Sequence, residues 1–236
     1  MSKILLTICA RGGSKGVAGK NVRLINGKPL ISITIKQAIE WGKADKIIVS
    51  TDSKEIAEIA KEYGAEVPFI RPSELATDDA PKLPVLQHAV KYSIENLGYN
   101  PDFVLDLDPT SPLREIRDIQ NCYDKLVNDP SCDCVISAFK AIKNPYFNMV
   151  EVKNNGKIEL SKNFNSHIIR RQDAPEVYSI NASVYVWRTK DLLNRNQIIS
   201  GNVKIMEMPY NRSIDIDCET DWEFVKYLLN KKHQQN

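Results

Sequence analysis

The sequence predicts an α/β fold with a mainly parallel sheet that is covered by helices on both faces. Short apolar runs alternate with longer amphipathic segments through the first 140 residues. Strands buried on both faces read as continuous apolar runs, and the helices between parallel strands form right-handed crossovers. A chain of 236 residues is long enough for one such fold, and we expect residues 1–236 to form a single domain.

The expected elements alternate along the chain. β-branched residues and flanking turns predict strands at 3–9, 46–51, 65–70, 102–107 and 133–139. Apolar residues that recur every three or four positions predict helices at 29–42, 53–64, 82–98 and 115–129. Three of these helices end at or near a glycine, which is a common helix stop.

The alternation stops near residue 144. Residues 144–160 predict two strands joined at Asn155-Gly156, a pair that favours a hairpin turn. A polar stretch follows, and residues 170–187 show no regular helical pattern. The chain closes with a predicted strand at 204–208 and a helix at 219–232. We therefore expect the region of about 144–180 to be a small β-containing insertion into the α/β domain.

Composition excludes several classes of protein. The net charge of +2 is too small for a nucleic-acid-binding surface, so we expect no nucleic-acid partner. No apolar stretch approaches the roughly 20 residues of a membrane span. The first apolar run is too short for a signal peptide, and we expect a cytoplasmic protein. The five cysteines are odd in number and scattered, which predicts reduced thiols and no disulfide framework.

A glycine-rich loop, "ICARGGSKGVAGKN" at 8–21, follows the first strand. A loop at this place lies at the carboxyl edge of the sheet, where open α/β folds bind ligands. Its glycines and basic residues suit a polyphosphate. A Walker A loop is excluded because Ser14 stands at its first glycine position and Asn21 follows Lys20. The dinucleotide pattern G-x-G-x-x-G is also absent from the loop.

Two carboxylates near the C-terminus are candidate metal ligands. Asp215 and Asp217 are two residues apart, which places both on one side of an extended segment. Two such carboxylates with phosphate oxygens form a typical Mg²⁺ site. The alternative is that one of them caps the helix that starts near Glu219, with Asp221 as a charge of its first turn.

Five blocks in order give the sequence a resemblance to a known family. The first is the Ala-Arg-x-x-Ser-Lys-Gly pattern of the glycine-rich loop with Lys-Asn behind it. The others are "IIVSTDSKEIAEIAKEYGAEV" with "IRPSELATDDAP", then "LDPTSPLR", "RRQDAPEVYSINASVYV" and "SIDIDCETDWE". Together they resemble the acylneuraminate cytidylyltransferases, also called CMP-sialic acid synthetases, over nearly the whole chain.

This resemblance implies a Rossmann-like nucleotidyltransferase sheet and a CTP-dependent reaction. A nine-carbon α-keto acid sugar would attack the α-phosphate of CTP and release pyrophosphate, with Mg²⁺ or Mn²⁺ as cofactor. The insertion would serve sugar binding and the contact of a homodimer. The implied catalytic residues are Arg11, Lys20, Asp215 and Asp217, and the last two would also be the metal ligands.

The resemblance also implies two sets of binding residues. The CTP-binding set is Ala10, Arg11, Gly13, Ser14, Lys20, Asn21 and Arg71. The sugar-binding set is Asp108, Thr110, Ser111, Arg171, Gln172, Asn181 and Tyr185. Alternatives from the residues alone are a solvated Arg71 and a Tyr185 that packs in the core. Arg114 is a further candidate, with the alternative that it is a first-turn residue of the next helix, and His167 is a candidate for a sugar contact.

One position departs from the family pattern. The sialic-acid enzymes usually carry Gln directly before P-T-S-P-L-R, whereas this chain has Asp108. An ionised aspartate only accepts hydrogen bonds, whereas glutamine also donates. This change and the stretch "KNPYFNMVE" at 143–151 are most like the branch that makes CMP-legionaminic acid. The alternatives are a CMP-N-acetylneuraminate synthetase, a nucleotidyltransferase with another nucleotide or sugar-1-phosphate, and a non-catalytic nucleotide-binding module.

Overall fold

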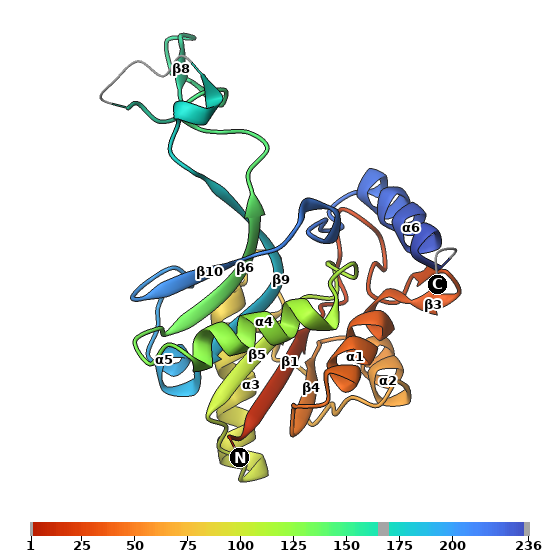
Figure 1. Cartoon of the computed structure of the whole chain (residues 1–236). Helices are drawn as coiled ribbons and strands as arrows, with labels where there is room; N and C mark the ends of the chain where they lie inside the picture. The colour runs from red at the N-terminus through yellow and green to blue at the C-terminus, as the bar shows by residue number, and fades with distance from the viewer. Residues whose placement is uncertain (1, 165–169, 234–236) are drawn as a thin grey trace.

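The computed structural model describes residues 2–164 and 170–233, and its centre is a six-stranded sheet (Figure 1). The strand order is β10 (Val203–Glu207), β6 (Cys134–Lys140), β9 (Tyr178–Arg188), β5 (Phe103–Leu107), β1 (Ile4–Cys9) and β4 (Lys46–Ser50). Neighbouring strands are parallel except at β9, which runs antiparallel to both β5 and β6. The expected mainly parallel α/β sheet is confirmed.

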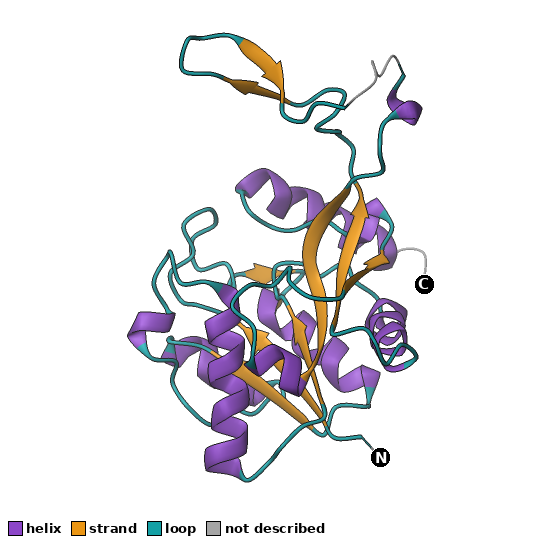
Figure 2. Cartoon of the chain, turned by 90° about the vertical axis from the view of Figure 1, so that its left-hand side faces the viewer, coloured by secondary structure: helices purple, strands orange, loops and turns teal. Residues whose placement is uncertain are grey.

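Helices cover both faces of the sheet (Figure 2). One face packs against α1 (Leu30–Trp41), α2 (Lys54–Glu62) and α4 (Ile116–Val127), around side chains such as Leu6, Leu105 and Val186. The other face packs against α3 (Lys82–Leu97) and the short α5 (Thr189–Leu193), around Leu5 and Val104. Neighbouring residues of one strand point to opposite faces of the sheet, and both faces are covered by helices. β1 and β5 are therefore apolar over most of their length.

Local sequence sets where the helices start and stop. Pro29 and Pro81 directly precede α1 and α3, in extended conformations that a helix interior excludes. α1 and α3 end at Gly42 and Gly98, whose φ angles of 69° and 61° are left-handed and favour glycine. The Ser53 side chain accepts a hydrogen bond from the Ile56 N–H and caps α2.

The last helix packs apart from the main core. α6 (Glu219–His233) buries Trp222 and Val225 against Ile25 and Ile216. Ile25 belongs to a small hairpin of β2 (Leu24–Ile25) and β3 (Lys28–Pro29) that follows the glycine-rich loop. The C-terminal segment is therefore anchored beside this loop.

One expected strand is wrong. Residues 65–70 form no strand and contribute a single bridge between Ile48 and Glu66. Pro68 has no N–H to donate to a ladder, and the chain leaves the sheet edge there. It returns at Arg71, whose N–H donates to the Thr51 carbonyl, before a short 3₁₀ turn, η1 (Ser73–Leu75).

The segment from residue 141 to 177 leaves the sheet between β6 and β9 as a projecting arm (Figure 1). Its described part holds the hairpin of β7 (Val150–Val152) and β8 (Ile158–Leu160) and the 3₁₀ turn η2 (Arg171–Asp173). The hairpin turns at Gly156, whose φ angle of 79° suits glycine. Several large apolar side chains of the arm are exposed, namely Met149, Val150, Val152, Ile158, Leu160 and Phe164.

Two expectations from composition can be compared with the structure. All five cysteines are free thiols, as expected. Within the described residues, no helix has the length and apolar character needed to cross a membrane.

Candidate functional site

A pocket of about 370 Å³ opens at the carboxyl edge of the sheet. It lies where β1 and β5 end, between the glycine-rich loop, the segment after Arg71, the start of α3 and the loop after β5. Parallel strands that end at one edge bring distant loops together there, which is why α/β folds bind ligands at that edge. Its lining includes eight of the implied residues, namely Arg11, Ser14, Lys20, Asn21, Arg71, Asp108, Thr110 and Asp217.

Two basic residues of the glycine-rich loop share one carboxylate. Arg11 Nη1 lies 2.6 Å from Asp78 Oδ1, and Lys15 Nζ lies 2.5 Å from Asp78 Oδ2. The hydrogen bond from Lys15, with that from Arg11, lowers the pKa of Asp78. Arg11 also donates to the Thr77 carbonyl at 3.2 Å. These contacts join the loop to the segment that follows η1 across the pocket, a link that the sequence did not predict.

The glycine-rich loop also contacts the C-terminal Asp motif. Lys20 Nζ donates to the Ile216 carbonyl, and Asn21 Nδ2 donates to the Arg11 carbonyl at 3.0 Å. A Cβ atom added to Gly16 would lie 1.9 Å from the Asp217 carbonyl oxygen. Glycine is therefore required at position 16 because the two backbones touch.

Arg71 is held from below by β4. Its side chain is buried, with Nε 3.0 Å from Ser50 Oγ and a second hydrogen bond from Nη2 to the Ser50 carbonyl. The alternative of a solvated Arg71 is therefore wrong. It lines the pocket as a fixed cation whose position is set by the end of a strand.

The two C-terminal carboxylates differ in their surroundings. Asp217 is exposed at the pocket, whereas Asp215 is mostly buried and its Oδ1 has no hydrogen-bond partner in the described structure. Burial, with the negative charge of Asp108, raises the pKa of Asp215 to about 6. The Asp221 carboxylate accepts the N–H groups of Asp217 at 3.0 Å and Cys218 at 2.9 Å. The carboxylate that caps the start of α6 is therefore that of Asp221.

The described residues contain no group of three or more Asp, Glu, His or Cys side chains that could hold a metal ion. Asp215 and Asp217 fit a divalent cation only if other oxygens complete its shell. The unpartnered, buried Oδ1 of Asp215 fits a cation ligand. Mg²⁺ in proteins is commonly held by one or two carboxylates with substrate phosphates and water, so this donor set suits a phosphate-bound Mg²⁺.

An ion-paired cluster that the sequence did not predict forms the floor of the pocket. Lys82 Nζ lies 2.7 Å from Asp106 Oδ2 and 3.0 Å from Asp108 Oδ2. The other oxygen of Asp108 accepts the Thr110 hydroxyl at 2.9 Å and its N–H at 3.2 Å. Asp108 therefore lines the pocket, but its carboxylate is already engaged. The sequence signal for Lys82 was weak because no motif contains it.

Three residues of the implied sugar set lie below the pocket surface. Ser111 Oγ donates to the Asn181 carbonyl at 3.0 Å, and Asn181 Nδ2 donates to Ser213 Oγ at 2.9 Å. Both side chains are buried, and they join the loop after β5 to the segment before Asp215. Tyr185 is 5% exposed and stacks on Trp187. It therefore packs in the core, which was the alternative to a sugar contact at this position.

Arg114 likewise acts within the protein. It is buried, its Nε donates to Ser183 Oγ at 3.0 Å, and its Nη2 donates to the Asp108 carbonyl. Burial lowers the pKa of Arg114 to about 10. Two residues of the implied CTP set also lie outside the pocket lining: Ala10 is buried in the core beneath the loop, and Gly13 is exposed.

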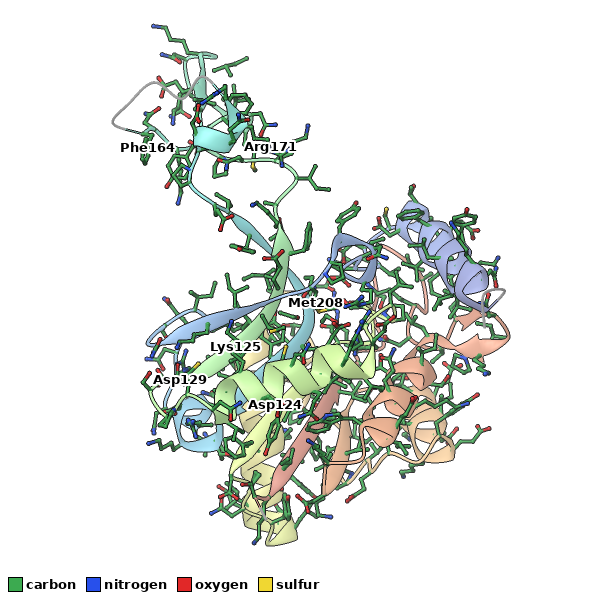
Figure 3. The ribbon with its side chains drawn as sticks, viewed as in Figure 1. Asp124, Lys125, Asp129, Phe164, Arg171 and Met208 are labelled. Atoms are coloured by element: carbon green, nitrogen blue, oxygen red, sulfur yellow. The ribbon has the colours of Figure 1, made fainter. Side chains whose placement is uncertain are left out.

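Arg171 and Gln172 lie on the arm, which stands off from the sheet (Figure 3). They line a second cavity of about 350 Å³ together with Lys140, Asn144 and Glu176. Arg171 Nη2 donates to the Ala141 carbonyl at 3.0 Å. Within one chain the implied sugar set is thus divided between the pocket and the arm. His167 lies outside the described residues.

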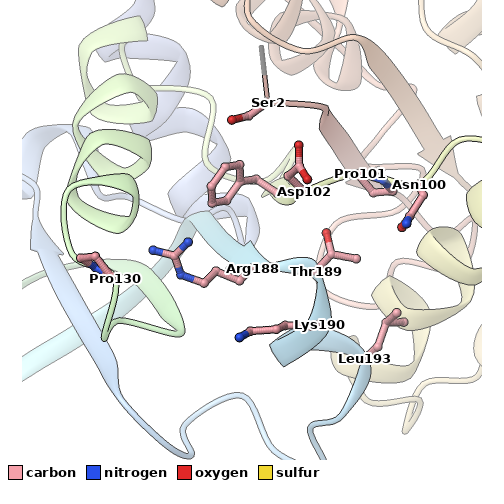
Figure 4. A pocket seen from close by; sticks show the side chains of 10 residues that line it. Ser2, Asn100, Pro101, Asp102, Pro130, Arg188, Thr189, Lys190 and Leu193 are labelled. Atoms are coloured by element: carbon pink, nitrogen blue, oxygen red, sulfur yellow. The ribbon is translucent and has the colours of Figure 1, made fainter.

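A larger cavity of about 870 Å³ lies at the other edge of the sheet, where β5 begins (Figure 4). Its Arg188 guanidinium donates to the carbonyls of Leu126, Asp129 and Cys132. These bonds close the C-terminal end of α4, so this cation is committed to the fold. The amino-terminal edge of a parallel sheet is also not where such folds bind ligands.

Comparisons with known proteins agree with this geometry. The profile of the family described as Cytidylyltransferase matches residues 5–228. The chain is 41% identical over 233 residues to the CMP-N,N'-diacetyllegionaminic acid synthase of Campylobacter jejuni, covering 99% of this chain and 97% of that protein. It is 40% identical over 235 residues to the post-translational flagellin modification protein B of Campylobacter coli, covering 100% of this chain and 98% of that protein.

A solved structure has the same fold. The CMP:2-keto-3-deoxy-manno-octonic acid synthetase in complex with CTP superposes with a TM-score of 0.72 at 18% identity. The match covers 98% of this chain and all of that one. At this identity the likeness concerns the fold alone.

The raised pKa of Asp215 predicts a pH-dependent loss of stability in the metal-free protein. Its pKa of about 6 in the folded state exceeds the ordinary 3.8, so the folded state holds the proton more tightly. Stability is then lost as the pH rises from about 4 to above 6, by up to about 3 kcal/mol. Asp215→Asn should remove this loss and unfold at higher denaturant than the wild type at pH 7.5 in EDTA.

Urea unfolding at pH 4.5 and 7.5 measures this effect. The control is Asp79→Asn, which changes an exposed carboxylate next to Asp78 in the sequence. An Asp215→Asn protein that gains no stability over the wild type between the two pH values contradicts the prediction.

Proposed function

Because the chain belongs to the cytidylyltransferase family, we propose that it transfers CMP from CTP to a nonulosonic, sialic-acid-like sugar. The observation that carries this proposal is the single pocket in which the cations of the glycine-rich loop meet Asp217 and Thr110. A binding module without catalysis would need no carboxylate pair beside its phosphate cations. The family match over residues 5–228 supports the enzyme over that alternative.

The reaction exchanges one phosphorus–oxygen bond for another. The anomeric hydroxyl of the sugar attacks the α-phosphorus of CTP, and the bond from that phosphorus to the bridging oxygen breaks. Pyrophosphate leaves, and the hydroxyl proton passes to solvent. Catalysis of such transfers consists largely of positioning and charge neutralisation, which the pocket's residue types suit.

The basic side chains of the pocket would bind the triphosphate. Arg11 and Lys20 come from the glycine-rich loop, and Arg71 comes from the segment before η1, where it is held by Ser50 at the end of β4. In the free protein Arg11 is paired with Asp78, which offers less negative charge than a triphosphate. Arg11 and Lys20 are proposed to stabilise the charge that develops on the departing pyrophosphate.

Asp215 and Asp217 are proposed to hold Mg²⁺, or Mn²⁺, together with phosphate oxygens. The cation would supply positive charge at the phosphates. The chain's own contribution is to keep both carboxylates beside the glycine-rich loop through the Gly16–Asp217 contact and the Lys20–Ile216 hydrogen bond. Since CTP is a cytoplasmic metabolite, we place the reaction in the cytoplasm.

The proposed sugar is legionaminic acid or a close relative with 5,7-diacetamido substitution. Support comes from the 41% identical relative that is named a CMP-N,N'-diacetyllegionaminic acid synthase. Asp108 in place of the usual glutamine supports this branch as a sequence motif alone, because both oxygens of its carboxylate already accept hydrogen bonds from Lys82 and Thr110. The alternative acceptor is N-acetylneuraminic acid, and the two are separated by their kcat/KM values.

The first test measures pyrophosphate release by the purified chain. We expect release only when CTP, a divalent cation and a nonulosonate are all present. The kcat/KM for the 5,7-diacetamido sugar should exceed that for N-acetylneuraminic acid. Equal rates with UTP or ATP would refute the cytidylyl assignment, and a preference for N-acetylneuraminic acid would refute only the proposed sugar.

Removing either carboxylate should cost catalysis without unfolding the protein. Asp215→Ala and Asp217→Ala are each expected to lower kcat by about 10²–10³, as for other preorganised electrostatic contacts. Saturating Mg²⁺ should restore part of the rate if the carboxylate binds the cation. Near-normal kcat at low Mg²⁺ in both variants contradicts the proposed role.

We also propose that the protein is a homodimer formed through the arm. The arm has exposed apolar residues on both strands of its hairpin, and a two-stranded hairpin is marginally stable by itself. A second copy would cover these residues. It would also bring Arg171 and Gln172 to the pocket of its neighbour, which joins the two halves of the implied sugar set.

Light scattering should therefore give twice the 26.8 kDa mass of one chain. Val150→Glu combined with Val152→Glu places charge on the exposed strand of the hairpin and should shift the protein toward monomer. The control is Val127→Glu, an exposed apolar position at the end of α4 outside the arm. A wild-type mass of 26.8 kDa at every concentration would exclude the dimer.

A further inference from the structure

Asp106 is an unexpected residue in the middle of the sheet. It lies in β5, between apolar residues on a strand that is buried throughout, and its side chain is fully buried. Burying a carboxylate is costly unless it is paired and hydrogen-bonded. Thr7 Oγ1 donates to Asp106 Oδ1 at 2.9 Å, and the Lys82 ammonium supplies the opposite charge.

Lys82 is equally unusual at its own position. It is the first residue of α3, where the helix dipole favours negative side chains over positive ones. Its Nζ lies 4.5 Å from the centroid of the Tyr185 ring. Burial alone would lower the pKa of Lys82, but the charges of Asp106 and Asp108 raise it well above the usual value. Departures from local rules that leave a protein intact are expected at functional sites.

The cluster is connected to the proposed metal carboxylates. Lys82 pairs with Asp108, and the other oxygen of Asp108 accepts the Thr110 hydroxyl and N–H. The Thr110 carbonyl in turn accepts the Ile216 N–H at 3.0 Å, between the two carboxylates. The Lys82 side chain is 20% exposed and lines the pocket, so it faces both this chain of contacts and the ligand space.

Lys82 supplies the positive charge next to two of the carboxylates. The cations in and beneath the described lining are Arg11, Lys15, Lys20, Arg71, Lys82 and the buried Arg114. The carboxylates are Asp78, Asp106, Asp108, Asp215 and Asp217. Without Lys82, the excess of one positive charge would be lost, and Asp106 and Asp108 would lose the ion pairs that neutralise them. These two carboxylates would then repel a triphosphate more strongly, because charges at a partly buried site interact more strongly than in water.

We propose that Lys82 is a positioning residue for the nucleotide, which neutralises Asp106 and Asp108 and keeps Asp108 and Thr110 in place beside the triphosphate. The ammonium group has three N–H donors, and its anionic partners among the described residues are these two carboxylates. One donor thus remains for an acceptor of the ligand. This inference rests on the proposed function for the identity of the nucleotide.

The test compares the dissociation constant for CTP with Mg²⁺ by calorimetry, and the KM and kcat in the pyrophosphate assay. Lys82→Met should weaken CTP binding by about tenfold or more, with a smaller change in kcat. Asp108→Asn, which removes negative charge and keeps the shape, should tighten CTP binding by about threefold or more. The double variant Lys82→Met/Asp108→Asn should return close to the wild-type affinity. Lys82→Arg should retain most of the affinity.

Lys46→Met is the matched control. Lys46 also pairs with a carboxylate, Glu66 at 3.1 Å, and also lies over a tyrosine ring, that of Tyr99 at 5.8 Å. It stands at the start of β4, at the opposite edge of the sheet, and its replacement should leave CTP affinity unchanged.

When Lys82→Met folds, two outcomes overturn the proposal. One is unchanged CTP affinity in Lys82→Met, and the other is a double variant that binds as weakly as Lys82→Met alone. Lys82→Met could fail to fold because Asp106 is left unpaired. In that case the CTP affinity of Asp108→Asn tests the proposal, and an affinity equal to or weaker than that of the wild type refutes it. If the wild type binds CTP but turns over no nonulosonate, the proposed function alone is refuted. The CTP affinities of the wild type and of the Lys82 and Asp108 variants still test the role of Lys82.

Discussion

A buried asparagine holds the carboxyl edge of this sheet together. Asn181 accepts hydrogen bonds from Ser137 Oγ at 2.6 Å and from the Ser183 N–H, and it donates to Ser213. Its carbonyl accepts Ser111 Oγ. One residue in β9 therefore links β6 and the segment that carries the two proposed metal carboxylates through its side chain, and the loop after β5 through its backbone carbonyl. Buried networks of this kind specify one arrangement when every member is satisfied.

The backbone of β9 adapts to make these contacts. Ala182, directly after Asn181, has a left-handed φ of 51°, and the pairing of β9 with β6 is irregular between Ile136 and Ala138. A residue other than glycine rarely adopts such a φ, and strain of this kind collects at functional sites. The irregularity turns the Asn181 side chain toward the neighbouring loops. The loops beneath the pocket and the strand β9 are therefore held together by one hydrogen-bond network.

Sequence patterns predicted the fold well because the main signals were local. Buried strands between amphipathic helices, with glycine at helix ends, are set by residues that lie close together in the chain. The expected strand at 65–70 failed because Pro68 has no N–H for a ladder, a local signal against a strand that the apolar run outweighed. Arg11, Lys20 and Asn21 were identified as pocket residues because they belong to the motif of a single loop, the glycine-rich loop.

Other parts of the site depended on contacts between distant segments. Ser111, Asn181 and Tyr185 belong to the sequence motifs, but they are buried and support the pocket from below. A motif does not distinguish such supporting residues from residues that touch a ligand. Lys82 and Asp106 are 24 positions apart in the sequence and belong to no motif, so only folding brings the ion pair together. Asp78 lies in the block "IRPSELATDDAP", but its ion pairs with Arg11 and Lys15 join segments that are distant in the sequence.

The antiparallel strand β9 of the six-stranded sheet has a consequence for how such proteins diversify. Lys140 at the end of β6 is paired with Tyr178 at the start of β9, so the arm leaves and rejoins the sheet at adjacent points. The ends of the excursion are fixed by the ladder, and the cost of closing a loop grows only slowly with its length. The arm can therefore be lengthened, shortened or exchanged in evolution while the sheet stays as it is. Changes in the arm can thus accumulate without disturbing the strands that frame the nucleotide pocket.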